Sequence, residues 1–110
     1  MDSRPVADAR VWQSTVVSVA YDSDVDKVRQ LLAEAAVAQE RVLKDPAPNA
    51  ALSAFGADGL EFTLGYWIAD PENGQLNLRS DINMAILRAL RENGIEIPYP
   101  QRIVHMKPGA

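Results

Sequence analysis

The clearest strand pattern in the chain runs from residue 60 to residue 68. Here apolar residues alternate with small or polar ones, so one face should be buried and the other largely wet. The apolar set is Leu60, Phe62, Leu64, Tyr66 and Ile68, and the opposite set is Glu61, Thr63, Gly65 and Trp67. Residues 50–55 are also extended, and the turn formers of residues 56–59 between the two segments predict a hairpin.

Residues 11–21 are rich in β-branched and aromatic types and predict a first strand, whose buried set this mixed pattern leaves open. A helix should begin after Asp22 and Asp24. Its apolar residues recur at steps of three and four from Val25 to Leu43, which predicts about five turns packed on the sheet. Basic Arg41 and Lys44 would then lie at its C-terminal end, and the proline-rich residues 45–49 would end it.

A second amphipathic helix is predicted around residues 78–90, with Gly94 as its C-terminal cap. Ile95, Ile97 and then residues 102–106 form a last extended stretch. Prolines at positions 98 and 100 interrupt it and exclude a central place in a sheet for that segment.

The predicted order is strand, helix, strand, strand, helix, strand. This order indicates an α+β fold, the ferredoxin-like βαββαβ two-layer sandwich, with both helices on one face of the sheet. We expect a flexible N-terminal segment over residues 1–10, the domain over residues 11–101, and a strand and tail over residues 102–110 that extend away from it. The fold hosts many unrelated activities and does not specify a function.

Composition narrows the functional classes. The 110 residues carry a net charge of −4 and no cluster of basic residues, so nucleic-acid binding is disfavoured. The absence of cysteine excludes disulfides and thiolate metal sites. Apolar runs fall far short of the roughly 20 residues that cross a bilayer, and no signal-peptide pattern opens the chain. We expect this chain alone to be soluble.

Three groups of residues could suggest chemistry, and each has a plainer explanation. Asp22 and Asp24 could hold a hard cation, but short acidic residues at a helix start favour capping. Gly56 and Gly59 precede a strand and not a helix, so a hairpin turn is preferred to a phosphate cradle. His105 is the only histidine. No nucleophile–base pair is visible, and we therefore expect neither an enzyme nor a bound cofactor or metal.

Three segments together resemble a known family. They are residues 17–24 (VSVAYDSD), residues 41–46 (RVLKDP) and, above all, residues 94–101 (GIEIPYPQ). Over about residues 10–106 the chain is similar to the C-terminal domain of the small-conductance mechanosensitive channels, the MscS family. The resemblance implies a homoheptamer whose membrane helices and middle β domain lie outside this sequence. It also implies a vestibule on the cytoplasmic side of the cell membrane.

The resemblance further implies that residues 102–106 supply one strand to a parallel barrel on the symmetry axis. In such an assembly, exposed apolar area should mark contacts with other copies of the subunit and with the remaining domains. The candidate interface residues are Trp12, Trp67, Pro98, Tyr99, Pro100, Gln101, Ile103 and His105. The implied role is vestibule assembly and the passage or filtering of solutes released during osmotic shock.

One alternative stays open, a stand-alone ferredoxin-like module that binds a small molecule or regulates a partner. A defined, saturable pocket would favour this module. An empty sheet face and a protruding C-terminal strand would favour the channel domain.

Overall fold

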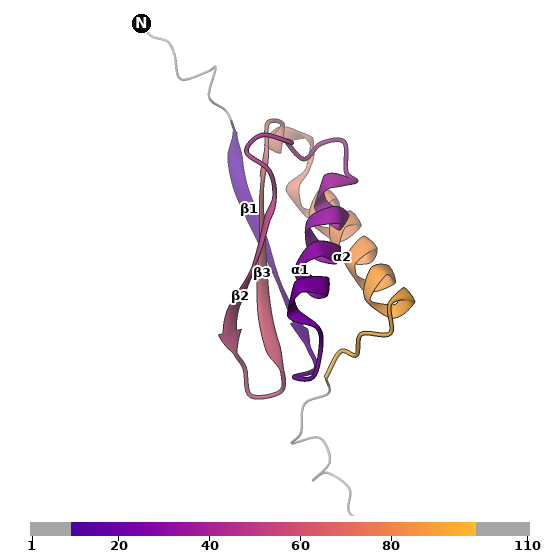
Figure 1. Ribbon diagram of the computed structural model, residues 1–110. Coiled ribbons are helices and arrows are strands. Elements are labelled where there is room, and N and C mark those ends of the chain that lie inside the picture. Colours follow the sequence, from indigo (N-terminus) through magenta and orange to yellow (C-terminus); the bar gives the residue numbers. More distant parts are fainter. Residues whose placement is uncertain (1–9, 99–110) are drawn as a thin grey trace, which may run out of the picture.

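The computed structural model describes residues 10–98, which form a mixed α+β domain (Figure 1). In chain order the elements are β1 (Val11–Val19), α1 (Val25–Val37), β2 (Asn49–Phe55), β3 (Leu60–Ile68), the short 3₁₀ helix η2 (Pro71–Asn73) and α2 (Gln75–Glu92). The predicted fold class is confirmed, with three antiparallel strands and two helices.

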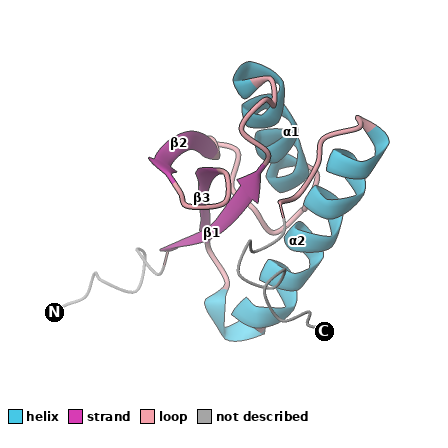
Figure 2. Cartoon of the chain, turned by 90° about the horizontal axis from the view of Figure 1, so that it is seen from below, coloured by secondary structure: helices cyan, strands magenta, loops and turns pink. Residues whose placement is uncertain are grey.

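The sheet has the order β1-β3-β2, with β3 in the centre. β3 pairs antiparallel with both neighbours, and the pairing with β2 shifts register between Leu52 and Ala54. Both helices cover the same face of the sheet, as predicted (Figures 1 and 2). The opposite face has no helix over it, and we call it the open face.

The buried core lies between the sheet and the two helices. All five apolar residues predicted for the inner face of β3 are buried, with exposed fractions between 0 % and 5 %. They meet apolar side chains spaced along the two helices, which are Val28, Leu31, Leu32, Ala35 and Ala36 of α1 and Leu78, Ile82, Ile86 and Leu90 of α2. The strand period of two and the helix period of 3.6 therefore converge on one core.

Of the two acidic residues expected to cap the first helix, Asp24 does so, and Gly94 caps the second helix as predicted. The Asp24 side chain accepts a hydrogen bond from the Lys27 backbone N–H at 3.2 Å, which starts α1. Gly94, with φ of +69°, ends α2. The Ile95 N–H donates to the Leu90 carbonyl and the Gly94 N–H to the Arg91 carbonyl, the two bonds of a Schellman motif.

The predicted length of the first helix was wrong. α1 ends at Val37 and has no basic residue in its last turn. The apolar spacing continues beyond the end of α1 because Val42 is also buried. A β-bridge to Ile68, and not a helix, holds Val42 in the core. Leu43 donates its N–H to the Trp67 carbonyl at 2.9 Å, so this loop is fixed to the end of β3.

The last predicted strand can be followed only at its beginning. Residues 95–98 belong to no helix or strand, although the Ala20 N–H donates to the Glu96 carbonyl at 2.9 Å. The segment 102–106 predicted to follow, and residues 1–9 at the other end, lie outside the described residues.

Candidate subunit interface

On β1 and β3, every second residue points away from the helices. These residues lie opposite one another across the two strands and form this part of the open face. In register these are Trp12 with Trp67, Ser14 with Gly65, Val16 with Thr63 and Ser18 with Glu61. Only one of the eight, Glu61, is charged. The face therefore combines apolar and hydroxyl-bearing side chains with little charge, a composition suited to contact with another protein surface.

Trp12 and Trp67 meet at one end of this face. They are directly opposite each other on β1 and β3, and Trp12 is 53 % exposed while Trp67 is partly covered. Arg10 lies near Trp67, with its guanidinium carbon 6.0 Å from the ring centroid, at the outer limit of a cation–π contact. The sequence placed Trp67 on the wetter face of its strand, and the structure brings both predicted tryptophans together.

Gly65 makes this arrangement possible. A Cβ atom at residue 65 would lie 2.4 Å from the Trp12 ring, well inside any real contact distance. The indole therefore occupies the space that a side chain would fill. Val16 extends the apolar surface along β1 and is 61 % exposed. The alternation of β3 already predicts that Gly65 lies on this face. The contact of Gly65 with Trp12 and the place of Val16 depend on the register of β1 against β3, which the sequence did not predict.

Of the other predicted interface residues, the structure describes only Pro98. Its ring lies close to Gly59, since a Cβ atom at Gly59 would be 2.9 Å from the proline Cγ. Pro98 is thus at the opposite end of the sheet from the two tryptophans. Tyr99, Pro100, Gln101, Ile103 and His105 lie outside the described residues.

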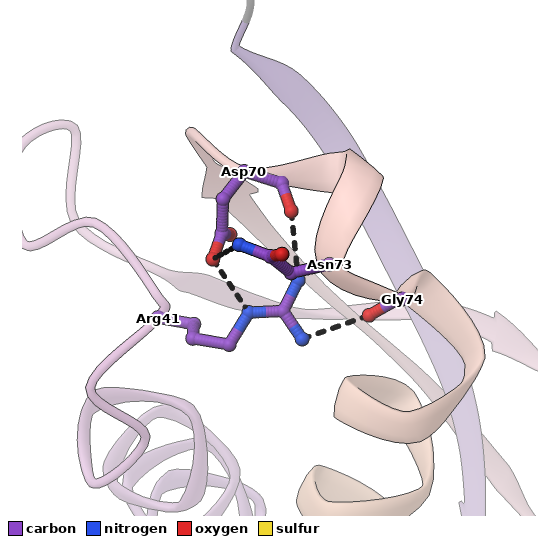
Figure 3. Close-up of polar contacts among 4 residues, drawn as sticks. All are labelled: Arg41, Asp70, Asn73 and Gly74. Atoms are coloured by element: carbon purple, nitrogen blue, oxygen red, sulfur yellow. Dashed lines mark hydrogen bonds and ion pairs between the residues drawn. The ribbon is translucent and has the colours of Figure 1, made fainter.

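A polar cluster beyond the end of β3 holds the loop after α1 against the start of α2 (Figure 3). Arg41 donates to the Asp70 carboxylate at 2.9 Å, to the Asp70 carbonyl at 2.9 Å and to the Gly74 carbonyl at 2.8 Å. The hydrogen bonds from Arg41 and Asn73 lower the pKa of Asp70. Arg41 and Asp70 are 26 % and 29 % exposed, so this ion pair is partly screened by water.

Arg41 was predicted at the end of a helix, and its actual role is to tie two loops together. The other carboxylate oxygen of Asp70, Oδ1, is buried and has no partner among residues 10–98. No sequence pattern could have paired Arg41 with Asp70, because they are 29 positions apart.

A second polar group is enclosed under the helices. The Tyr66 hydroxyl donates to Gln13 at 3.0 Å, and Gln13 donates to Gln75 at 2.9 Å. Burial raises the pKa of Tyr66, and Arg79 nearby opposes that shift. Gln13 is 4 % exposed, so its amide needs these partners to avoid an unsatisfied buried dipole.

The chemical alternatives find little support in the described part of the chain. Asp24 caps α1, as its plainer explanation predicted. Gly56 and Gly59 form the hairpin turn, where the Gly56 N–H donates to the Gly59 carbonyl. Within residues 10–98, no three acidic or histidine side chains gather as metal ligands would. Over the same residues, neither helix has the length and apolar character required to span a bilayer.

Comparison with known proteins identifies the family to which the domain belongs. Residues 14–97 match the family model described as mechanosensitive ion channel MscS, C-terminal. The chain belongs to the MscS family. It is 35 % identical over 91 residues to an MscS family protein of Synechocystis sp. and 33 % identical over 91 residues to the small-conductance mechanosensitive channel of Edwardsiella ictaluri.

Each of these matches covers 83 % of the chain and about a third of the relative, 30 % and 31 % respectively. Among solved structures, the closed state of Helicobacter pylori MscS superimposes with a TM-score of 0.76 at 31 % identity, covering 83 % of this chain and 36 % of that one. Arabidopsis thaliana MSL1 carrying A320V shares the fold, with a TM-score of 0.68 at 14 % identity, over 84 % of this chain and 36 % of that one.

Proposed function

We propose that this MscS-family domain forms part of the cytoplasmic vestibule of a mechanosensitive channel. There it would contribute to oligomeric assembly and to the passage or filtering of solutes released in osmotic shock. The supporting observation is the open face of the sheet, where Trp12 and Val16 are 53 % and 61 % exposed on a surface with little charge. Such a surface is costly to leave in water and is typical of a contact with another part of an assembly.

The partners proposed for this face are other copies of the subunit, seven in the full channel, and the membrane and middle β domains of the parent protein. The Edwardsiella ictaluri relative is about three times the length of the matched region and is a small-conductance mechanosensitive channel. Trp12 lies at the start of β1, where the polypeptide enters the domain (Figure 1). Contacts made through Trp12 and Trp67 would therefore fix the domain close to the point where it joins preceding chain.

The test is a graft. Residues 10–110 replace the corresponding domain of the Edwardsiella ictaluri channel, and the hybrid is expressed in bacteria that lack their own mechanosensitive channels. We expect survival of a sudden drop in osmolarity and stretch-activated currents in membrane patches. A hybrid that inserts and assembles at normal levels but neither conducts nor protects the cells would contradict the proposed function.

A matched pair of variants tests the open face within the same graft. Trp12→Asp places a charge on the face, whereas Phe55→Asp places one on a residue that is 77 % exposed and pairs with helix-facing Leu60. We expect Trp12→Asp to reduce the assembled fraction on a native gel and Phe55→Asp to leave it unchanged. Equal assembly of both variants would exclude the open face as a contact surface.

A further inference from the structure

One flank of α2 carries three polar side chains at four-residue intervals, Gln75, Arg79 and Asn83, which we call the donor row. Residues four apart are neighbours on successive turns of a helix, with a rise of about 6 Å between them. The row borders β1, because Gln75 and Asn83 both contact side chains of that strand. Both amides are exposed and Arg79 is half buried between them, so a ligand in solvent can reach all three.

In both amides of the donor row, β1 already uses the oxygen. The Gln13 side-chain N–H donates to Gln75 Oε1 at 2.9 Å. The Thr15 hydroxyl donates to Asn83 Oδ1 at 2.9 Å. Gln13 is itself held in place, because its oxygen accepts from the buried Tyr66 hydroxyl at 3.0 Å. The NH2 groups of Gln75 and Asn83 donate to no residue that the structure describes, so both remain for another partner.

Arg79 adds a positive charge that no carboxylate offsets among the described residues. No acidic side chain forms an ion pair with it there, and Asp81, two positions further on, lies on another side of the helix. The guanidinium lies instead beside the Tyr66 hydroxyl, which is neutral at pH 7. Its Nε is buried and has no hydrogen-bond partner within residues 10–98. A partly buried cation without a counter-ion is costly, so this position favours an anion.

The chemistry of the donor row fits a carboxylate better than a phosphate. A guanidinium offers two parallel N–H groups to the two oxygens of a carboxylate, and the amides on either side add neutral donors. The row carries a single positive charge, which one carboxylate neutralises. A phosphate group carries close to two negative charges at pH 7 and would leave one of them without compensation.

We propose that the donor row of α2 is a binding site for a carboxylate group. Arg79 supplies the charge and the fork of N–H donors, and the NH2 groups of Gln75 and Asn83 hydrogen-bond the carboxylate oxygens. β1 contributes by orientation, since Gln13 and Thr15 hold the amide oxygens and leave the nitrogens to face the ligand. The site therefore depends on the register of α2 against β1 and not on Arg79 alone.

This site lies apart from the surface that supports the proposed function. α2 covers one face of the sheet, and the open face is the other (Figure 2). The carboxylate can come from either of two sources, a small organic acid or an Asp or Glu side chain of the surrounding assembly. Both present the same group to Arg79, so binding is tested first and the source second.

Titration of the 110-residue chain with sodium acetate tests the binding. We expect the side-chain N–H signals of Gln75, Arg79 and Asn83 to shift saturably in NMR spectra, with a dissociation constant on the order of 10 mM. Sodium chloride at the same ionic strength should not produce these shifts, and sodium phosphate should bind more weakly. Shifts that are absent, or that chloride or phosphate reproduce at equal concentration, would overturn the proposal.

A matched pair of arginine variants locates the binding. Arg79→Gln should weaken acetate binding at least about fivefold, because the charged fork is lost. Arg88→Gln removes the same charge from an exposed residue nine positions later, on the opposite side of α2, and should leave the affinity unchanged. Arg79→Lys keeps the charge, which favours folding, and should still bind more weakly because it lacks the fork. Equal affinities in all three folded variants would overturn the proposal.

The grafted channel identifies the source of the carboxylate. If an Asp or Glu side chain of the assembly fills the site, Arg79→Glu should lower the assembled fraction on a native gel and Arg88→Glu should not. If a small acid fills it, the two grafts should assemble alike. Both results presuppose saturable acetate binding, whose absence overturns the proposal. Acetate binding together with a graft that assembles but does not conduct would contradict the vestibule role and support the carboxylate site.

Discussion

The indole of Trp12 occupies the place where Gly65 would carry a side chain. Gly65 is the diagonal neighbour of Trp12 on β3, and a Cβ atom there would approach the ring to 2.4 Å. A ring placed over a strand glycine covers the exposed backbone and replaces the missing packing. Trp12 is therefore positioned by a residue that has no side chain.

Gly65→Ala should destabilise the domain and release Trp12 from the sheet. Because the ring must move to make room, we expect a loss of about 1–3 kcal/mol in the free energy of unfolding. Urea unfolding followed by circular dichroism measures that loss, and fluorescence should show Trp12 more exposed in the folded state. Ser18→Ala on the same face is the control and should stay within about 0.5 kcal/mol of the parent. An unchanged stability for Gly65→Ala would show that the ring is not held there.

The inner face of β3 was predictable from sequence because every second residue of this strand is apolar. All of these apolar residues pack into the same buried core. Gly65 could not be assigned a role in the same way. Its contact with Trp12 depends on the register of β1 against β3, two segments about 50 positions apart. The two tryptophans were recognisable as candidates one at a time, but their meeting was not.

The end of α1 also shows what sequence patterns alone cannot predict. Val42 continues the helical spacing although the helix has already ended, because a buried position looks the same in sequence whether a helix or a bridge to Ile68 buries it. Arg41 satisfied the expectation of a basic residue at a helix end, and its real partners are in the loop after β3. Here the apolar spacing predicted correctly that Val42 is buried, but it assigned Val42 to the wrong type of secondary structure.

The ion pair of Arg41 and Asp70 predicts how stability depends on pH. Hydrogen bonds from Arg41 and Asn73 lower the pKa of Asp70 below its unfolded value. The folded state then favours the ionised carboxylate, so this contribution is fully present above the unfolded pKa of about 3.9 and is lost as the pH falls through the folded pKa. Asp70→Asn should be less stable than the parent at pH 7, and the difference should shrink below about pH 4. Equilibrium unfolding between pH 7 and pH 2.5 measures it.

Ser18→Ala is the control for that pH dependence, because it changes no titratable group. Its difference from the parent should vary little over the same range. A difference for Asp70→Asn that stays constant down to pH 2.5 would mean that the carboxylate charge contributes nothing to the cluster.

Gly94 allows a test of backbone conformation with no change in packing. Its φ of +69° lies in the left-handed region, and a Cβ atom there would meet nothing within 4 Å. Gly94→Ala should therefore cost about 1–2 kcal/mol through conformation alone. Gly94→Asn should cost less, since asparagine tolerates this region better. Thermal unfolding compares the two variants, and equal losses would argue against a conformational cause.

The buried hydroxyl of Tyr66 supports the last prediction. Tyr66→Phe removes the donor to Gln13 and leaves a buried amide oxygen without its partner, which should cost about 1–3 kcal/mol. Gln13→Leu removes the group that would be left unsatisfied. In the double variant the cost of Tyr66→Phe should therefore be smaller than in the parent background, because an apolar pair needs no hydrogen bond. Urea unfolding of the four proteins in this cycle measures the coupling, and strictly additive losses would show that the hydroxyl and the amide contribute independently.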